Sequence, residues 1–428
     1  MTVTVVIGLQ WGDEAKGKMV DILCQDADIV ARYNGGDNAG HTVVNSYGTF
    51  KLRLVPNGIA NPKTQCVIGP GVVVNLDTLL GELEYIHSKG IKLSERFWLS
   101  PRCHVVMPYH PMLEEVYENA KGSARTGTTG RGIGPVYADK VSYNGIRLAD
   151  LAHPQIFKEK LRIQLEVKNT LFRACAMPPL DLETIYQEKL SDYARLQLMV
   201  REPFGLVQEA LQRGANLLLE GAQGALLDND WGTYPFATAS TTIAGGASAG
   251  LGIAPHLIRR VVGVAKAYTS RVGSGPMPTE LLDEAGQTLR DEGQEYGTVT
   301  GRPRRCGWLD AELVHFTAQL NGATELALTK LDVLDHLPTI KICAGYHHPQ
   351  TPQRVAHYWE GDAHWLAQCE PVYIEMPGWQ QSTRQARRFA DLPPQAQAYV
   401  HKVEELVGAP VSYISVGPGR EEGFWRQP

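Results

Sequence analysis

The feature that most constrains the fold is the pattern of residues 3–18. Residues 3–8 are a β-branched run that ends in glycine, a polar loop follows, and residues 18–25 carry apolar side chains at helical spacing. Residues 12–18 also fit G-x-x-x-x-G-K, the pattern of a loop that cradles phosphate groups between a strand and a helix. The chain therefore opens with a predicted strand, a phosphate-binding loop and a helix.

One position of this loop departs from the usual pattern. Ser or Thr commonly follows the lysine and contributes a hydroxyl ligand to magnesium, but this chain has Met19. A metal ion would need an oxygen ligand from elsewhere in the loop, and Asp13 is the natural candidate. The alternative interpretation is a glycine turn with two surface lysines.

Similar apolar runs recur along the chain. We expect further strands within residues 66–74, 216–221, 259–268, 325–334 and 411–417, and helices at 157–172 and 182–200. Many of the runs show little alternation, which is typical of strands covered on both faces. The predicted fold is α/β, with a large, mostly parallel central sheet flanked by helices and with long functional loops. We expect residues 1–428 to form a single domain with a helical insertion around 150–215.

Glycine is the most over-represented residue. The chain has 43 glycines in 428 residues, above the usual share of about 7%. They gather in short polar islands, where backbone N–H groups can approach a ligand closely. The islands are residues 8–18, 34–42, 125–135, 220–224, 244–252, 271–276, 299–307 and 416–420.

Charge and cysteine content exclude several classes of protein. The net charge of -5 provides no basic field for nucleic acid, so small ligands are the expected partners. The seven cysteines are widely spaced and include no C-x-x-C pair, which fits neither a disulfide framework nor a zinc ribbon. The first residues lack a secretory signal, and no apolar run is long enough to cross a membrane. We expect a cytoplasmic protein.

Three further groups of residues suggest chemistry. Residues 329–332 (TKLD) follow a predicted strand and match a guanine-reading loop, which favours GTP over ATP, although many strands end in such a sequence. His41 lies in a polar glycine loop and could act as an acid beside Asp13 as the base, unless it is a structural histidine. Residues 302–305 (RPRR) carry three guanidinium groups suited to carboxylates or phosphates; a solvated basic turn is the alternative.

Together these motifs resemble the adenylosuccinate synthetase family, whose members couple IMP and L-aspartate at the expense of GTP. The resemblance covers nearly the whole chain, and the motifs occur in the family's order. They are QWGDEAKGK at 10–18, NAGHT at 38–42, GTTGRGIGP at 127–135, EGAQG at 220–224, GTYP at 232–235, RVGSGPMPTE at 271–280, TGRPRRCGWLD at 300–310, TKLDVLD at 329–335, EMPGW at 375–379 and ISVGPGR at 414–420.

The resemblance implies a reaction in two steps. Asp13 would remove the N1 proton of IMP, and the O6 oxyanion would then attack the γ-phosphate of GTP. His41 would donate a hydrogen bond to the transferring phosphate, while Lys16, Lys18 and one Mg2+ neutralise the developing charge. The aspartate amine would displace phosphate from C6, giving adenylosuccinate, GDP and phosphate.

The resemblance also assigns residues to each ligand. The catalytic residues would be Asp13, His41, Lys16 and Gln223. GTP would contact Gly12, Glu14, Ala15, Gly17, Lys18, Gly40, Thr42, Lys330, Leu331, Asp332, Ser415, Val416 and Gly417. IMP would contact Asp13, Asn38, Ala39, Thr128, Thr129, Gln223, Thr238 and Arg302. Aspartate would contact Thr298, Val299, Thr300, Gly301, Arg302 and Arg304. Mg2+ would take Asp13 and the Gly40 carbonyl, and the chain would form a homodimer.

Several positions depart from the family's pattern. Ala15 replaces a loop glycine, so we expect that position to avoid a positive φ unless strain is accepted. Asp37 and Trp231 stand where histidines are common, and Val299 replaces a threonine. Tyr143 replaces an arginine that reaches across the dimer to the nucleotide phosphate. We therefore expect weaker IMP binding, unless Lys140 or Arg147 compensates or the nucleotide preference has changed.

Two alternatives to IMP–aspartate ligation stay open. One is a paralogue that ligates aspartate to another 6-oxopurine nucleotide, such as a dGMP-like substrate, and the loss of arginine at 143 motivates it. The other is a GTP-binding regulator without catalytic activity. The presence of Asp13, His41, Arg302 and Arg304 argues against the regulator.

Overall fold

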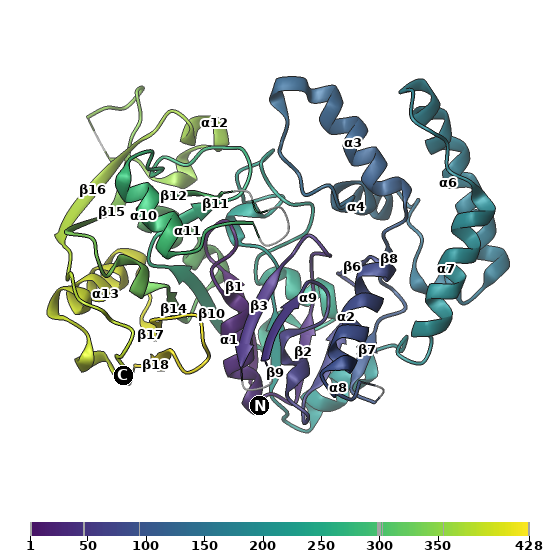
Figure 1. Ribbon diagram of the computed structural model, residues 1–428, viewed down its shortest axis with the longest axis horizontal. Coiled ribbons are helices and arrows are strands. Elements are labelled where there is room, and N and C mark those ends of the chain that lie inside the picture. Colours follow the sequence, from purple (N-terminus) through teal and green to yellow (C-terminus); the bar gives the residue numbers. More distant parts are fainter. Residues whose placement is uncertain are drawn as a thin grey trace.

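The computed structural model describes residues 2–45, 48–93, 95–297, 301, 303–353 and 355–426. A nine-stranded sheet runs through its centre, helices cover both faces, and the two ends of the chain lie on the same side (Figure 1). The predicted α/β architecture with a large, mostly parallel sheet is confirmed.

The order of the strands places β1 in the middle of the sheet. From edge to edge the order is β18 (Gly423–Trp425), β17 (Val411–Ser415), β14 (Glu325–Thr329), β10 (Ile258–Lys266), β1 (Val3–Gly8), β9 (Leu217–Glu220), β2 (Ile29–Arg32), β5 (Gln65–Ile68) and β7 (Phe97–Leu99). Every pair is parallel except β17 with β18. All residues of β1, β2 and β9 are buried, as expected of strands covered on both faces.

The helices occupy the connections between the strands. They are α1 (Lys16–Leu23), α2 (Leu76–Ser88), α3 (Tyr109–Lys121), α4 (Ile133–Val141), α5 (Leu148–Leu151), α6 (Pro154–Ala174), α7 (Leu182–Leu196), α8 (Phe204–Gln212), α9 (Gly245–Leu251), α10 (Glu284–Glu292), α11 (Ala311–Asn321), α12 (Ala363–Leu366) and α13 (Pro394–Val407). The predicted helix at 157–172 lies within α6, whereas the predicted helix at 182–200 ends earlier, with α7.

Four small sheets lie beside the large one. They are the hairpin of β3 (His41–Asn45) with β4 (Gly48–Leu52), the pair β6 (Val73–Val74) with β8 (His104–Val105), the pair β11 (Thr269–Arg271) with β12 (Arg305–Gly307), and β13 (Leu309–Asp310) with β15 (Thr339–His347) and β16 (Glu370–Pro377). The apolar run at 66–74 is divided between two strands, β5 and β6. A Cβ at Gly71, between them, would lie only 2.0 Å from the Tyr33 carbonyl oxygen, so the chain turns where only glycine fits.

Two large apolar cores hold these layers together. One lies between the centre of the sheet and helices α11 and α13. The second joins β5 and β7 to α2, α6 and α7, with Phe97, Phe157 and Ile185 among its buried side chains. Helices α6 and α7 therefore share a core with one edge of the sheet although they project at one end of the molecule (Figure 1). No helix in the described ranges combines the length and the apolar character needed to cross a lipid bilayer.

Candidate active site

The parallel sheet gathers the predicted ligand loops at one edge. The loops that follow β1, β2, β9, β14 and β17 all leave the carboxyl ends of their strands, where ligands bind in open α/β sheets. They carry, in that order, the phosphate loop, the loop of Asn38 and His41, the EGAQG segment, the TKLD segment and the loop of Ser415. Segments distant in the sequence thus meet at one place because their strands are neighbours.

Glu14 organises the phosphate loop from within. Its buried carboxylate accepts the backbone N–H groups of Gln10 at 3.1 Å and Gly12 at 2.8 Å, and it pairs with Lys16 Nζ at 2.7 Å. A Cβ at Gly8 would lie 2.3 Å from this carboxylate, so a side chain there would displace the carboxylate from its partners. The Glu14 side chain, one of the predicted GTP contacts, therefore serves the loop itself.

Ala15 adopts the conformation that we expected an alanine to avoid. Its φ of 67° and ψ of 34° lie in the left-handed region, directly before α1. The Ala15 carbonyl accepts the backbone N–H of Lys18 at 3.1 Å, which begins the helix. The loop accepts a strain of about 1–2 kcal/mol at this residue to place the amides that follow it.

Lys18 and Thr329 connect the phosphate loop to two distant strands. Lys18 Nζ donates hydrogen bonds to Ser415 Oγ at 2.7 Å and to the Gly417 carbonyl at 2.8 Å. Burial lowers the pKa of Lys18 to about 8, although the carboxylates of Glu422 and Asp332 act in the opposite direction. The Thr329 hydroxyl donates to the Glu14 carbonyl at 2.9 Å. The structure thereby joins the phosphate loop to the other two predicted GTP segments.

Buried side chains and hydrogen bonds hold the predicted guanine-reading segment in place. Asp332 is buried, and Arg384 Nε lies 3.5 Å from its Oδ2. Three residues further on, the Asp335 carboxylate accepts hydrogen bonds from Trp379 Nε1 at 2.8 Å and from the Thr383 hydroxyl at 2.9 Å. Leu331 and Val416, two other predicted GTP contacts, are fully buried.

His41 is held by a carboxylate that the sequence reasoning missed. His41 begins β3, and its Nδ1 lies 2.7 Å from Glu220 Oε1. The Asn57 amide donates to the same oxygen at 2.6 Å, and the Asn57 backbone N–H donates to Oε2 at 2.9 Å. Burial lowers the pKa of His41, while Glu220 acts in the opposite direction. Glu220 closes a buried apolar strand, which was the signal that could have identified it.

A chain of side-chain hydrogen bonds joins three of the predicted IMP residues. Gln223 Nε2 donates to Asn38 Oδ1 at 3.0 Å, and Asn38 Nδ2 donates to Thr238 Oγ1 at 3.3 Å. Gly12 of the phosphate loop adjoins them, because a Cβ there would lie 3.9 Å from the Gln223 backbone. Ala39, which follows Asn38 in the sequence, is buried.

Gly17 of the phosphate loop packs closely against His41. A Cβ at Gly17 would lie 3.2 Å from the His41 Cβ and 3.3 Å from the Asn57 amide nitrogen. The absence of a side chain at Gly17 therefore allows the first turn of α1 to approach the predicted acid.

The GTTGRG loop, residues 127–132, follows α3 and is hydrogen-bonded to that helix. Its backbone is anchored by Glu118, which accepts the Gly127 N–H at 2.9 Å, and by Glu114, which accepts the Gly132 N–H at 2.7 Å. The Thr128 hydroxyl also bonds to Glu114. Thr128 and Thr129 are both exposed. Their contact with IMP stays a prediction.

Two of the departures from the family's pattern have visible neighbours. Asp37 is buried, accepts a hydrogen bond from the Thr78 hydroxyl at 3.0 Å and lies 3.9 Å from Arg131 of the GTTGRG loop. Trp231 is half exposed, and its backbone N–H donates to Asp228 at 3.1 Å. Asp37 thus connects two predicted IMP loops.

The predicted base and one predicted aspartate-binding arginine form an ion pair. Arg304 Nε lies 3.0 Å from Asp13 Oδ2, and Arg304 NH1 donates to Glu295 Oε2 at 2.8 Å. Gly301 is exposed, and its N–H donates to the Gly297 carbonyl at 2.8 Å. The remaining predicted contacts of this loop, Thr298, Val299, Thr300 and Arg302, lie outside the described residues. Gly40 and Thr42 are exposed at the entry of the β3–β4 hairpin.

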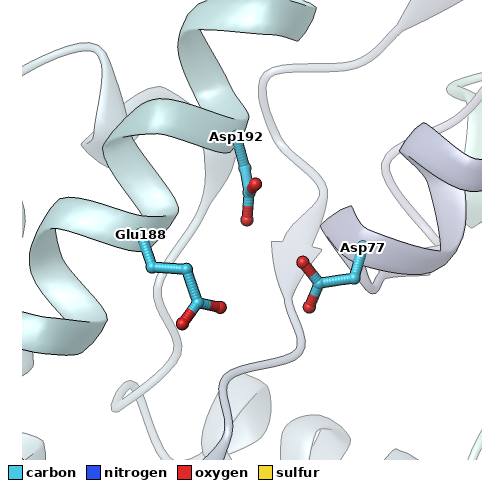
Figure 2. A group of neighbouring side chains, drawn as sticks. All are labelled: Asp77, Glu188 and Asp192. Carbon is cyan, nitrogen blue, oxygen red and sulfur yellow. The ribbon is translucent and has the colours of Figure 1, made fainter.

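Outside this site, three carboxylates face one another between α2 and α7 (Figure 2). They belong to Asp77, Glu188 and Asp192, with ligand atoms within 4.8 Å of one another. The ammonium group of the buried Lys189 already lies among them, at 3.0, 2.7 and 2.9 Å from the three carboxylates. We therefore assign this group to an ion-pair cluster and not to a metal.

Known proteins resemble this chain over its whole length. The family model for adenylosuccinate synthetase matches residues 5–424. The adenylosuccinate synthetase of Heliobacterium modesticaldum is 49% identical over 423 residues, covering 99% of this chain and 98% of that protein. The chain belongs to the adenylosuccinate synthetase family. It is a GTP-dependent ligase of purine biosynthesis.

Two solved structures and a second relative by sequence are also similar to this chain. The fully ligated adenylosuccinate synthetase of Plasmodium falciparum superposes with a TM-score of 0.94 at 35% identity, covering 100% of both chains. A second relative by sequence, the adenylosuccinate synthetase of Dehalococcoides mccartyi, is 45% identical over 427 residues, the full length of both chains. The succinoaminodeoxyadenylate synthetase of cyanophage S-2L, bound to dGMP and dATP, reaches a TM-score of 0.63 at 20% identity over 99% of this chain and 95% of its own, and shares the fold.

Proposed function

We propose that this chain joins L-aspartate to IMP through a 6-phosphoryl-IMP intermediate, with the residues assigned above in their predicted roles. The observation that carries the proposal is the contact between Asp13 and Arg304. It brings a carboxylate of the phosphate loop to 3.0 Å from a cation of the predicted aspartate loop. A base at this position can serve a purine that lies between a bound triphosphate and a bound dicarboxylate.

Asp13 would act as the base of the first step. It accepts the N1 proton of IMP, which moves electron density onto O6. The O6–Pγ bond then forms as the bond between Pγ and the β,γ-bridging oxygen of GTP breaks, and GDP leaves. Lys16 and Lys18 lie at the start of α1, where their charges and the backbone amides favour the phosphate oxygens.

His41 would stabilise the phosphoryl group in transfer. With Nδ1–H held on Glu220, Nε2 is the nitrogen available to a ligand. To donate from Nε2, the imidazole must carry a second proton, and both the Glu220 carboxylate and an incoming phosphate favour that charged form. Glu220 is thereby a positioning residue for His41.

The second step would use the aspartate amine. It attacks C6 of the phosphorylated purine, its proton is lost, and the C6–O6 bond breaks to release phosphate. Gln223, Asn38 and Thr238 would orient the nucleotide through their hydrogen-bonded chain. Arg304 would hold a carboxylate of the amino acid, and Lys330 with Asp332 would hold the guanine base.

The reaction would use one Mg2+ held by Asp13 and the Gly40 carbonyl. Both are oxygen donors, the kind that Mg2+ prefers, and both residues are accessible, because the Asp13 side chain is 31% exposed and Gly40 is exposed. When bound, the ion would neutralise charge on the phosphate groups.

We also propose a homodimer in the cytoplasm. Tyr143 is 97% exposed just beyond α4, at the position where the family has its cross-subunit arginine. Lys140 and Arg147, the candidates to compensate for that arginine, line a cavity of about 310 Å³ together with His104, Ser240 and Thr241. This cavity adjoins the loop of residues 34–42, which carries Asn38, because the Asn34 amide donates to Ser240 Oγ at 3.2 Å.

The function is tested by incubating the chain with GTP, Mg2+ and aspartate together with IMP, dIMP, GMP or dGMP in turn. The absorbance change of a 6-substituted purine reports ligation. We expect IMP to be the best substrate. Absence of product with IMP would contradict the proposal, and turnover with dGMP alone would favour the paralogue motivated by Tyr143.

A further inference from the structure

Glu295 is a buried carboxylate to which the reaction above assigns no role. It follows α10 closely, its side chain is 0% exposed, and it lies just before the predicted aspartate loop. Its Oε1 accepts hydrogen bonds from Lys266 Nζ at 3.0 Å, from Lys330 Nζ at 2.6 Å and from the Tyr268 hydroxyl. Its Oε2 accepts from Arg304 NH1 at 2.8 Å. A single carboxylate thus contacts three cations.

The three cations come from different parts of the site. Lys330 belongs to the predicted guanine segment, Arg304 to the predicted aspartate loop, and Lys266 ends β10, beside the phosphate loop. The backbone N–H of Lys266 donates to the Gln10 side chain at 2.9 Å, which fixes Lys266 beside the residues that lead into the phosphate loop. Glu295 therefore contacts the predicted guanine segment, the predicted aspartate loop and a lysine beside the phosphate loop.

The cations around Glu295 carry more charge than the carboxylates that they contact. Within the described residues, Lys266, Lys330 and Arg304 contact two carboxylates, those of Glu295 and Asp13, so one positive charge is in excess. The cations hold the pKa of Glu295 far below its ordinary value against the effect of burial, so the carboxylate is ionised. An incoming carboxylate would balance the remaining charge.

Arg304 is only half satisfied by this arrangement. NH1 is hydrogen-bonded to Glu295, whereas the buried Nε–H makes no hydrogen bond within the described residues, although Asp13 Oδ2 lies 3.0 Å away. A buried donor without an acceptor is costly, and a carboxylate ligand would supply the missing acceptor. The backbone reinforces this orientation, because the Arg304 N–H donates to the Glu295 carbonyl at 2.8 Å.

We infer that Glu295 is a positioning residue that determines the affinity for the amino-acid substrate. It holds one side of the Arg304 guanidinium so that Nε is presented to a carboxylate of the substrate, and it keeps Lys330 and Lys266 from repelling that guanidinium. Without it, the ion pair left to Arg304 among the described residues is the one that it already makes with Asp13. This inference rests on the proposed function, because it assumes that Arg304 binds aspartate.

The test compares Glu295→Gln with the unmodified chain in steady-state kinetics. An amide cannot neutralise three cations, so we expect the KM for aspartate to rise at least tenfold and the KM for GTP about threefold. The KM for IMP should stay within twofold, because Gln223, Asn38 and Thr238 do not touch Glu295. Glu295→Asp keeps the charge but is shorter, and should raise the KM for aspartate to a smaller extent.

Glu82→Gln is the matched control for loss of a buried carboxylate. Glu82 accepts the backbone N–H groups of Arg53, Leu54 and Val55 and touches none of the predicted ligand residues. Its variant should unfold at a lower temperature with all KM values unchanged. If Glu295→Gln fails to fold, the Glu295→Asp variant carries the test.

The outcomes separate the two proposals. An unmodified chain that forms no adenylosuccinate would overturn the proposed function. Normal turnover by the unmodified chain would instead leave the function intact, and the role of Glu295 would be overturned if both Glu295 variants had a KM for aspartate within twofold of the normal value or if all three KM values rose together.

Discussion

At the scale of single residues, Lys18 gives a prediction about protons. Its pKa of about 8 in the folded chain, against an ordinary 10.5, means that the folded state favours the neutral amine. Between these two values the folded chain binds fewer protons than the unfolded chain, so this residue makes stability rise with pH there. Bound phosphate groups favour the charged form, so GDP binding at pH 9 should take up close to one proton.

Calorimetry in buffers of different ionisation enthalpy measures this proton uptake. Lys18→Arg is the control, because a guanidinium stays charged at pH 9 and its variant should bind GDP without the uptake. Equal uptake in both proteins would show that another group is responsible.

The sequence indicated those site residues that belong to contiguous motifs. Asp13, Asn38 and Gln223 lie in such motifs and Thr238 was assigned from the family resemblance, and the structure brings the last three into one hydrogen-bonded chain. Glu220 and Glu295 were not assigned to the site because a single carboxylate that ends a buried strand, or that follows a helix closely, is a weak signal on its own. Asn57, a partner of Glu220, is 163 positions away in the chain, whereas the partners of Glu295 are 9 to 35 positions away.

At the scale of elements, Lys189 connects α7 to α2 through an ion-pair cluster. Its side chain is 2% exposed and lies 3.0, 2.7 and 2.9 Å from the three carboxylates that Figure 2 shows. Lys189→Met would leave these carboxylates to repel one another, and we expect the free energy of unfolding to fall by about 3 kcal/mol. Urea unfolding measures this loss, and kcat should stay unchanged.

The exposed ion pair of Lys158 with Glu183 provides the comparison. It joins α6 to α7 at 2.6 Å, but both side chains are about half exposed. Lys158→Met should therefore lower the free energy of unfolding much less than Lys189→Met does. Equal losses in the two variants would contradict the role given to the Lys189 cluster.

The limits of the elements were harder to predict than their kinds. Strand β10 and helix α6 agree with the runs at 259–268 and 157–172, because long apolar or amphipathic runs carry a clear period. The division of residues 66–74 into β5 and β6 depends on the close approach of Gly71 to Tyr33, which only the folded chain brings about.

At the scale of the whole molecule, the cysteines should report an intact, reduced fold. All seven are free thiols, and only Cys175 is exposed. Burial also raises the pKa of Cys24 and Cys103 to about 12, which further slows their reaction. A thiol reagent should therefore modify one group rapidly in the folded chain and seven after unfolding, and Cys175→Ser should abolish the rapid phase. Several rapid thiols in the folded chain would contradict this structure.

Tyr143 connects the single chain to the proposed dimer. It lacks the positive charge that the family uses on the nucleotide phosphate, and its side chain is almost fully exposed. Tyr143→Arg should therefore lower the KM for IMP about threefold to tenfold, whereas Tyr143→Gln should not. A KM for IMP that does not fall in the arginine variant would show that the charge is supplied elsewhere, for example by Lys140 or Arg147. The single-domain organisation of residues 1–428 stays a prediction.

The position of β1 has a consequence for how the molecule is made. Strand β1 leaves the ribosome well before its sheet neighbours β9 and β10, which follow it by more than two hundred residues. Lys18 likewise meets Ser415 across 397 positions. At a synthesis rate of about 10 residues per second, the phosphate loop waits roughly 40 seconds for its last partner. The predicted GTP site of the nascent chain is thus incomplete until Ser415 has been made, and we expect nucleotide binding to begin only after that point.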